Sequence, residues 1–251
     1  MIMNKLIQLK NIKKNYYTKE KEILAIENVT LDIYEGEYMA IVGPSGCGKS
    51  TLLNIIGKID NKTSGEVITK DSIKIGYMLQ NDCLFSWLNI LDNCLLGLRI
   101  KGELTKDNIN YVKELLDTYG LHDFMYSYPG NLSGGMRQRV ALIRTLALRP
   151  DVLLLDEPFS ALDYQTRIRV ADDVYKIIKD THKTVIMITH DIGEACSVAD
   201  RVVVFSDRPS EVKEIYNIEM TNKSSPINNR KCPEFTKYYD MIWKAIDVYE
   251  K

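Results

Sequence analysis

Short apolar runs alternate with longer stretches of helical periodicity along most of this chain of 251 residues. Residues 25–43 are rich in Val, Ile and Tyr and predict two strands joined by a turn around Glu35 and Gly36. The continuous apolar run VLLLDEP at 152–158 is typical of a strand buried in a parallel sheet. Further strands are predicted at 65–69, 73–79, 184–189, 201–205 and 211–216.

Helices are expected between these strands. The first covers 49–57 and ends near Gly57, and Thr105 is a suitable N-cap within the helical region 89–127. Further helices are predicted at 141–148, stopping at Pro150, at 164–180, and as a short segment after 190. This order implies an α/β fold into which a helical lobe is inserted.

The C-terminal part begins with a polar stretch at 220–231 that predicts a loop. The helix after it carries apolar side chains at helical spacing, and we expect this stripe to dock onto the core rather than to bind a cofactor. The stripe consists of Phe235, Tyr238, Tyr239, Ile242, Ile246 and Tyr249.

Composition excludes several classes of protein. The chain has 33 basic and 34 acidic residues and a net charge of −1, so it lacks the basic surface of a nucleic-acid-binding protein. Its five cysteines are scattered without a C-x-x-C pair, which fits a reducing cytoplasm and argues against disulfides or a zinc site. The N-terminus lacks a signal-peptide pattern, and no apolar run approaches the roughly 18 residues of a membrane span. We therefore expect a soluble chain.

The segment GPSGCGKST fits the phosphate-binding pattern G-x-x-x-x-G-K-[ST] and lies between a predicted strand and a predicted helix. Glycines let backbone amides wrap phosphates, and the helix N-terminus adds positive potential. Lys49 is expected at the terminal phosphates and Ser50 at magnesium, whereas Cys47 is interpreted as a small filler rather than a catalytic thiol. The predicted nucleotide contacts are Gly43, Pro44, Ser45, Gly46, Cys47, Gly48, Lys49, Ser50 and Thr51.

Two carboxylates, Asp156 and Glu157, end the apolar run at 152–158. They are either structural caps or ligands of magnesium and water, and the phosphate-binding loop favours the second interpretation. Asp156 would hold Mg²⁺, and Glu157 would align the attacking water or accept its proton. A GTPase is disfavoured because NKTS at 61–64 lacks the aspartate of N-K-x-D, and a small-molecule kinase would not require NLSGGMRQR at 131–139.

Six motifs occur in a fixed order: GPSGCGKST, YMLQ ending at Gln80, LSGGM, LLLDEP, SALD and ITHD. In this order they resemble the nucleotide-binding subunit of an ATP-binding cassette (ABC) transporter, from about Leu6 to about Tyr216. The resemblance implies an ATPase with the α/β P-loop NTPase fold: a RecA-like core, an antiparallel β subdomain and a helical subdomain. It also implies a single ABC ATPase domain over 1–251. Its parts are an ATP-binding core with the β subdomain at 1–88 and 150–217, a helical subdomain with the LSGGM signature at 89–149, and a C-terminal loop and helix at 218–251.

The same resemblance implies a head-to-tail dimer with a second copy of the chain. Ser133, Gly134 and Gly135 would then face the ATP held by the partner. The lack of side chains at the two glycines would let the backbone approach the γ-phosphate of that ATP. Asp163 would cross the interface.

The remaining site residues are also assigned by resemblance. Tyr16, with Tyr17 as its competitor, would stack on adenine. Gln80 would contact magnesium and the water, and His190 would contact the γ-phosphate, although a lone histidine after an apolar run is otherwise a strand-end cap. Surface positions are expected for His122 and His182, and for a solvated helix face comprising Arg137, Arg139, Arg144 and Arg149, of which Arg137 and Arg139 could contact the signature loop.

The signature carries Met136 where glutamine is usual, and with LFSWLNILDN and RVVVFSDRP it resembles nitrate, sulfonate and taurine importers, although Ser86 replaces a usual proline. Importers of pyrimidine vitamin precursors stay an alternative. A soluble ABC ATPase that acts on DNA or ribosomes would be expected to carry two cassettes or a long coiled-coil insert, and the sequence shows neither. A non-catalytic regulator is disfavoured by intact Lys49, Glu157 and His190.

The expected partners are transmembrane permease subunits and, indirectly, a solute-binding protein, with the chain peripheral at the cytoplasmic face of the membrane. Phe85, Trp87 and Leu88, within 80–89, are candidates for the permease contact. The alternative is that Trp87 packs inside the domain.

Overall fold

The computed structural model describes residues 4–17, 21–70 and 72–246. Its strands are β1 (Lys5–Tyr17), β2 (Glu22–Tyr34), β3 (Tyr38–Val42), β4 (Ser64–Thr69), β5 (Ile75–Met78), β6 (Val152–Asp156), β7 (Thr184–Ile188), β8 (Arg201–Phe205) and β9 (Ser210–Asn217). Its α-helices are α1 (Lys49–Ile56), α2 (Ile90–Ile100), α3 (Lys106–Thr118), α4 (Gly134–Leu146), α5 (Tyr164–Thr181), α6 (Ile192–Val198), α7 (Pro226–Asn229) and α8 (Pro233–Ile246). Two 3₁₀ turns, η1 (His122–Phe124) and η2 (Pro129–Asn131), precede α4.

The described strands form one mixed sheet in the order β4-β1-β2-β9-β8-β3-β7-β6-β5. β1 pairs antiparallel with β2 and β4, whereas β3, β5, β6, β7 and β8 pair in parallel. The parallel setting predicted for 152–158 is therefore confirmed, and the chain has the mixed α/β fold expected of an ABC ATPase cassette.

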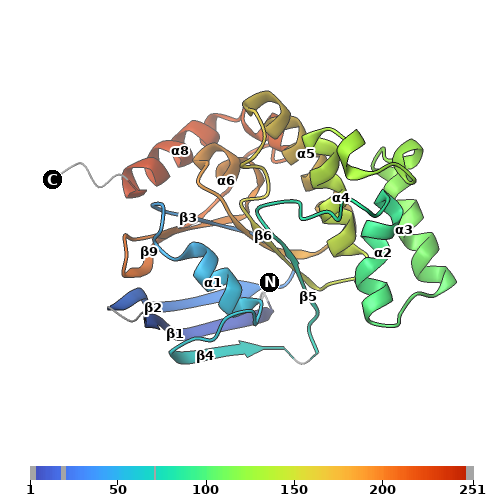
Figure 1. Ribbon diagram of the computed structural model, residues 1–251. Helices are drawn as coiled ribbons and strands as arrows, with labels where there is room; N and C mark the ends of the chain where they lie inside the picture. Colours follow the sequence, from blue (N-terminus) through green and yellow to red (C-terminus); the bar gives the residue numbers. More distant parts are fainter. Residues whose placement is uncertain (1–3, 18–20, 71, 247–251) are drawn as a thin grey trace.

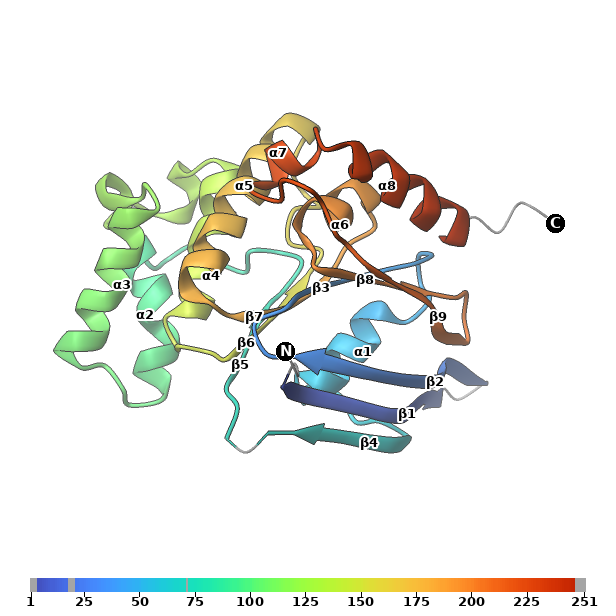
Figure 2. The same cartoon turned by 180° about the vertical axis from the view of Figure 1, so that it is seen from behind.

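The sheet curls around α1, which lies between the antiparallel strands and the parallel strands (Figure 1). Buried side chains of α1, β1 and β2, with Met39 and Ile41 of β3, belong to one apolar cluster inside this curl. A second cluster lies on the other face of the parallel strands, beneath α2, α4, α5, α6 and α8 (Figure 2).

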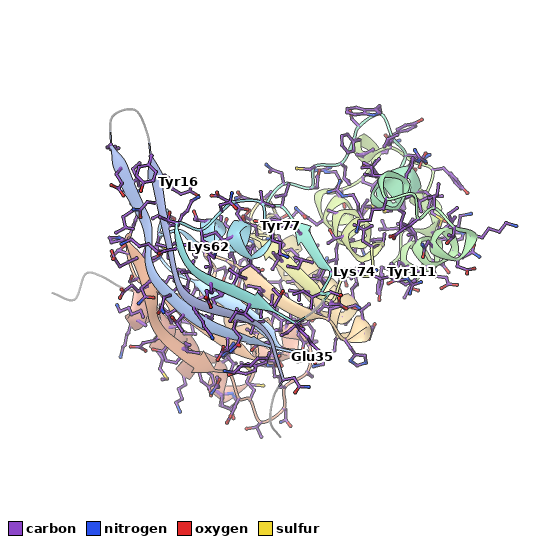
Figure 3. All side chains as sticks on the ribbon, turned by 90° about the horizontal axis from the view of Figure 1, so that it is seen from below. Tyr16, Glu35, Lys62, Lys74, Tyr77 and Tyr111 are labelled. Atoms are coloured by element: carbon purple, nitrogen blue, oxygen red, sulfur yellow. The ribbon has the colours of Figure 1, made fainter. Side chains whose placement is uncertain are left out.

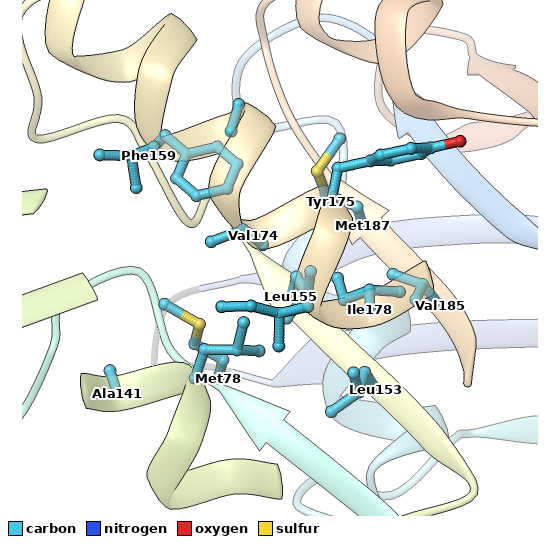
Figure 4. Close-up of a cluster of buried hydrophobic side chains, with 14 of the residues drawn as sticks. Met78, Ala141, Leu153, Leu155, Phe159, Val174, Tyr175, Ile178, Val185 and Met187 are labelled. Atoms are coloured by element: carbon cyan, nitrogen blue, oxygen red, sulfur yellow. The ribbon is translucent and has the colours of Figure 1, made fainter. Parts of the chain in front are cut away.

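β6 shows why its sequence is continuously apolar. Val152 and Leu154 face the cluster around α1, whereas Leu153 and Leu155 face the helical cluster. In Figure 4 these two leucines lie among Val174 and Ile178 of α5 and residues of β7. Alternate residues of a strand point to opposite faces, so burial of both faces requires an apolar residue at every position.

Helices α2, α3 and α4 stand together at one side of the molecule (Figure 1). The predicted N-cap of α3 is confirmed, because the Thr105 hydroxyl accepts a hydrogen bond from the Asn108 amide at 3.3 Å. α2 begins in the same manner, with the Asn89 side chain accepting from the Asp92 amide at 2.7 Å.

Some elements differ from the expectations. β1 was not predicted as a strand, because a register shift between Leu9 and Ile12, with Asn11 at a φ of 48°, breaks its apolar alternation. The expected loop at 220–231 contains the short helix α7, and α4 ends at Leu146 rather than at Pro150.

The C-terminal helix docks as predicted. Ile242 of α8 is fully buried, and α8 packs against α6, β8 and β9. Phe235, Tyr238, Tyr239 and Ile246 are partly buried on the same cluster, and Tyr249 lies outside the described residues. No helix in the described ranges combines the length and the apolar character that a membrane crossing requires.

The close approach of α4 and α5 leads to a prediction at Gly135. A Cβ at this buried position would lie 2.7 Å from Cγ2 of Val170, so a side chain would force the two helices apart. We expect Gly135→Ala to lower the free energy of unfolding by about 1–2 kcal/mol, because overpacking outweighs the better helix propensity of alanine. Urea unfolding measures this difference.

Gly130 provides the control, because a Cβ there would meet no atom within 4 Å. Gly130→Ala should stay within about 0.5 kcal/mol of the wild type. Equal unfolding midpoints for the two variants would contradict the steric explanation.

Candidate functional site

The loop between β3 and α1 is shaped by its glycines. Gly46 and Gly48 adopt φ values of 74° and 106°, in the region that favours glycine. A Cβ at Gly43 would lie 2.9 Å from the Phe205 carbonyl oxygen, and a Cβ at Gly48 would lie 3.2 Å from that of Ala25. The loop can therefore keep this shape only with glycine at these positions.

Lys49 begins α1 with its ammonium group at the mouth of this loop. Its Nζ donates hydrogen bonds to the carbonyl oxygens of Gly43 and Pro44, both at 2.8 Å. The neighbouring Cys47 is 1% exposed, and burial raises the pKa of its thiol. A reactive thiol needs a lowered pKa, so the burial of Cys47 agrees with a packing role.

Oxygen atoms gather beside the loop at the end of β6. The Ser50 hydroxyl donates to Asp156 Oδ1 at 3.0 Å, and the Tyr77 hydroxyl lies 3.4 Å from Asp156 Oδ2. Burial raises the pKa of the Asp156 carboxyl, and the hydrogen bond from Ser50 opposes this effect.

These donors fit magnesium, which prefers hard oxygen ligands and commonly takes one or two from the protein and the rest from phosphates and water. Within the described residues, no group of three or more His, Cys, Asp or Glu side chains is placed to hold a metal. A magnesium ion held by Ser50 and Asp156 would take its other ligands from phosphates and water.

The three predicted catalytic residues meet at one carboxylate. Glu157 Oε2 accepts a hydrogen bond from Gln80 Nε2 at 3.2 Å and lies 3.2 Å from His190 Nδ1. Glu157 itself has a φ of 44°, and its backbone amide donates to the Ile188 carbonyl at 2.9 Å. Strand ends that are far apart in the sequence thus place an acid, an amide and an imidazole together.

A groove with a volume of about 430 Å³ runs along the phosphate-binding loop to Tyr16. It is lined by Tyr16, Ile23, Ala25, Ser45, Gly46, Gly48, Lys49, Ser50, Thr51, Glu157 and Arg208. Its size and its lining of backbone amides, a lysine and an aromatic ring suit a nucleotide.

Tyr16 lies near the end of β1, at the edge of the molecule seen in Figure 3. Its hydroxyl donates to Asp60 Oδ2 at 2.8 Å, and the Lys14 ammonium lies 4.5 Å from its ring centroid. Its competitor Tyr17 is 72% exposed and is not part of the groove lining. The geometry therefore favours Tyr16 as the aromatic residue of this groove.

The signature residues lie apart from this groove. Ser133 is the exposed N-cap of α4, and its hydroxyl accepts from the Met136 amide at 3.3 Å. A Cβ at Gly134 would lie 2.9 Å from the Leu162 side chain. Crowding within their own chain is therefore a second reason why positions 134 and 135 require glycine. Asp163 caps α5 by accepting from the Thr166 amide at 3.1 Å.

The expectation of a solvated arginine face was wrong for Arg144, whereas Arg149 is exposed, and Arg137 contacts the signature loop by donating to the Leu132 carbonyl oxygen at 2.8 Å. Arg137 Nε pairs with Asp82 Oδ2 at 3.0 Å, and Arg144 donates to the carbonyl oxygens of Asp82 and Cys83 at 2.6 and 2.7 Å. α4 thereby holds the loop that follows Gln80. Arg139 pairs with Asp173, and the Arg149 guanidinium stacks on Tyr111.

The same loop presents two aromatic side chains. Trp87 is 70% exposed and Phe85 is 36% exposed, with ring centroids 5.0 Å apart, so the alternative that Trp87 packs inside is wrong. Fully buried Asn93 holds this stretch, because its side-chain amide donates to the carbonyl oxygens of Phe85, Leu88 and Asn89. As expected, His122 and His182 are exposed.

Comparison with known proteins agrees with this geometry. Residues 26–160 match the family model described as ABC transporter. The chain is 37% identical over 247 residues to the nitrate import ATP-binding protein NrtD of Synechocystis sp., covering 94% of this chain and 93% of that protein. It is 39% identical over 234 residues to the taurine import ATP-binding protein TauB of Jannaschia sp., covering 88% and 87%.

A solved structure with the same fold is a dimer of the ATP-binding cassette MJ0796 in a post-hydrolysis state, bound to ADP and Pi. It superposes with a TM-score of 0.72 at 36% identity and covers 85% of this chain and 99% of that one.

Arg208 is a groove residue that the sequence did not single out. It is exposed in the turn between β8 and β9, and its guanidinium makes no hydrogen bond or ion pair with another described residue. It belongs to the segment RVVVFSDRP that resembles importer ATPases, but within that segment it is marked only as a cationic position after a buried strand. An unpaired guanidinium beside a phosphate-binding loop is suited to an anionic ligand.

We expect Arg208→Ala to weaken ATP binding by about 3- to 10-fold, as the loss of one exposed charge-assisted contact. Titration with ATP, ADP and adenosine measures the effect, which should diminish as phosphates are removed. Arg169→Ala, at an exposed position of α5 outside the groove, is the matched control. An equal loss for adenosine would show that Arg208 does not contact phosphate.

Proposed function

Because the chain belongs to the ATP-binding proteins of ABC transporters, whose hydrolysis of ATP powers transport, we propose that it drives a membrane importer for a sulfonate, taurine, nitrate or a similar small solute. The similarity to NrtD and TauB supports this class of solute. The ATPase activity is supported by one observation above all: Gln80 and His190 both contact Glu157 beside the nucleotide groove.

ATP would lie along the groove with its adenine on Tyr16 and its phosphates on the amides of 43–51. Base stacking contributes roughly 1–3 kcal/mol. Lys49 is already held at the loop mouth, so its charge can meet the terminal phosphates without a large rearrangement. Magnesium, held by Ser50 and Asp156 and contacted by Gln80, would neutralise charge on the phosphates when bound.

Hydrolysis would depend on the carboxylate of Glu157. A water at this carboxylate would be oriented for attack on the terminal phosphate, and Glu157 can accept its proton. The His190 ring lies against Glu157 Oε2, and it can contact both this carboxylate and the γ-phosphate. Gln80 donates to Glu157 and leads directly into the loop that α4 anchors.

Assembly as a head-to-tail dimer would complete the site. Ser133 is exposed and outside the groove of its own chain, so a nucleotide bound by Ser133 would have to be held by another molecule. The MJ0796 cassette was solved as a dimer. We propose that Ser133, Gly134 and Gly135 bind the ATP of a second copy, with Asp163 at the interface.

The permease contact is proposed at Phe85 and Trp87, where an exposed aromatic pair is held by Asn93. Aromatic side chains are enriched at the centre of protein interfaces. The chain would thus bind peripherally at the cytoplasmic face of the membrane, and a separate solute-binding protein would select the solute.

The role of Glu157 and the dimer can be tested together. We expect Glu157→Gln to slow ATP hydrolysis by about 100-fold or more, because a general base is lost, and to leave a dimer that needs ATP. Hydrolysis assays and size-exclusion chromatography with ATP or ADP provide the measurements. Glu66→Gln, at an exposed strand position, is the control. Normal hydrolysis by Glu157→Gln would disprove the assigned role.

Reconstitution with the permease and binding protein in vesicles tests the transport function. We expect ATP-dependent uptake of taurine, an alkanesulfonate or nitrate, and at least a tenfold loss of uptake in Trp87→Glu, since a charge would be desolvated at the interface. The ATPase activity of the isolated variant should stay within twofold.

Trp243→Glu, on α8 and 53% exposed, is the matched control and should transport normally. Uptake of a pyrimidine vitamin precursor alone would overturn the proposed solute class. Loss of soluble ATPase activity in Trp87→Glu would indicate a structural role for that tryptophan.

A further inference from the structure

A buried carboxylate lies behind the site, outside the lining of the nucleotide groove. Glu194, in the first turn of α6, is 4% exposed, and its Oε2 accepts a hydrogen bond from the Thr189 hydroxyl at 2.5 Å. Its Oε1 is buried and has no hydrogen-bond partner among the described residues. A buried acid with an unpaired oxygen destabilises a fold, so packing alone does not explain Glu194.

Thr189 connects this carboxylate to the catalytic loop. Its hydroxyl oxygen accepts a hydrogen bond from the Asp191 amide at 3.0 Å, and its own amide donates to the Ile41 carbonyl at 3.3 Å. Thr189 and Asp191 flank His190. The Thr189 hydroxyl therefore links the two residues on either side of His190, the histidine that contacts Glu157.

The direction of these bonds depends on Glu194. A threonine hydroxyl has one proton, and giving it to the carboxylate leaves the oxygen lone pairs for the Asp191 amide. Asp191 is held further, because its carboxylate accepts from the Glu194 amide at 2.9 Å and lies 3.5 Å from Arg167.

We propose that Glu194 is a positioning residue for ATP hydrolysis, which orients the Thr189 hydroxyl and thereby fixes the loop that aims His190 at the reacting phosphate. The proposal rests on the role of His190 given under Proposed function. Glu194 touches neither nucleotide nor water in this arrangement and acts only through Thr189.

The charge on Glu194 gives this arrangement a pH dependence. Burial raises the pKa of Glu194 to about 7, while the hydrogen bond from Thr189 opposes the effect. The charged and titratable groups that face it are Asp191 at the start of α6, Arg167 of α5, Arg230 after α7 and Tyr38 of β3. The ionised carboxylate can only accept a hydrogen bond, whereas the protonated carboxyl can donate and reverse it. Positioning should therefore strengthen as the pH rises through about 7.

Glu194→Gln tests the proposal, because it keeps the shape of the side chain and removes its charge. We expect ATP affinity within twofold of the wild type and kcat lowered about tenfold at pH 8, but by no more than about twofold at pH 6, where the wild-type carboxyl is mostly protonated. Groups that titrate in both proteins cancel in the ratio of the two kcat values. A ratio that is constant from pH 6 to pH 8 would overturn the proposal.

Coupling to His190 is measured with His190→Ala and the double variant. If Glu194 acts through His190, adding Glu194→Gln to His190→Ala should cause no further loss of kcat. A further tenfold loss would overturn the proposal while leaving the role of His190 intact. Full activity of His190→Ala alone would disprove that role, and the proposal would fail with it.

Variants at Thr189 provide a second test if Glu194→Gln folds poorly. Thr189→Ser keeps the hydroxyl and should retain kcat, whereas Thr189→Val should lose about tenfold. Wild-type kcat in Thr189→Val would overturn the proposal.

Thermal unfolding reports the titration separately. Because the pKa of Glu194 is raised from the ordinary value of 4.5, the protonated carboxyl favours the folded state, and this stability is lost as the pH rises through about 7. Glutamine does not titrate, so the Tm of Glu194→Gln relative to the wild type should increase between pH 5 and pH 8. An unchanged difference in Tm would show that Glu194 does not titrate in this range and would contradict the pH dependence.

Discussion

The pairing register of three parallel strands is the constraint on which the site depends. Ile188 of β7 pairs with Ile41 of β3 on one side and with Asp156 of β6 on the other. The phosphate-binding loop follows β3, Asp156 and Glu157 lie at the end of β6, and His190 lies just after β7. A shift of one residue would turn every side chain of a strand to the opposite face, so the buried apolar residues on both faces fix the register of the site as well.

Much of this arrangement is local in the sequence and could be predicted there. Glycine spacing, a lysine at a helix start and acidic residues after an apolar run identify the nucleotide site, because backbone conformation and charge determine these positions directly. The predicted strands and most helix limits follow from periodicity for the same reason. The bulge in β1 escaped prediction because one residue in a left-handed conformation shifts the alternation that marks a strand.

Contacts between distant segments could not be predicted in this way. The sequence around Arg137 and Arg144 has the periodicity of a solvated helix face, yet both side chains bind the loop at Asp82. Nothing near Arg208 indicates a groove, because the turn reaches the phosphate-binding loop only after β8 and β9 have paired with their neighbours. Gly135 needs its lack of a side chain because of Val170, which belongs to a different helix. Such requirements depend on packing angles, which periodicity does not specify.

The site combines several features that lower stability. Glu157 holds a left-handed backbone, which costs about 1–2 kcal/mol for a residue with a Cβ, and Glu194 is an acid buried with one oxygen unpaired. Both lie next to β7: the Glu157 amide is held by Ile188, and the Glu194 carboxylate binds the hydroxyl that follows it. Strain of this kind persists only where surrounding structure determines it. Because β7 is buried at every position and paired on both sides, it is rigid enough to hold the two carboxylates in place. The stability of the core is thus used to fix the geometry around His190.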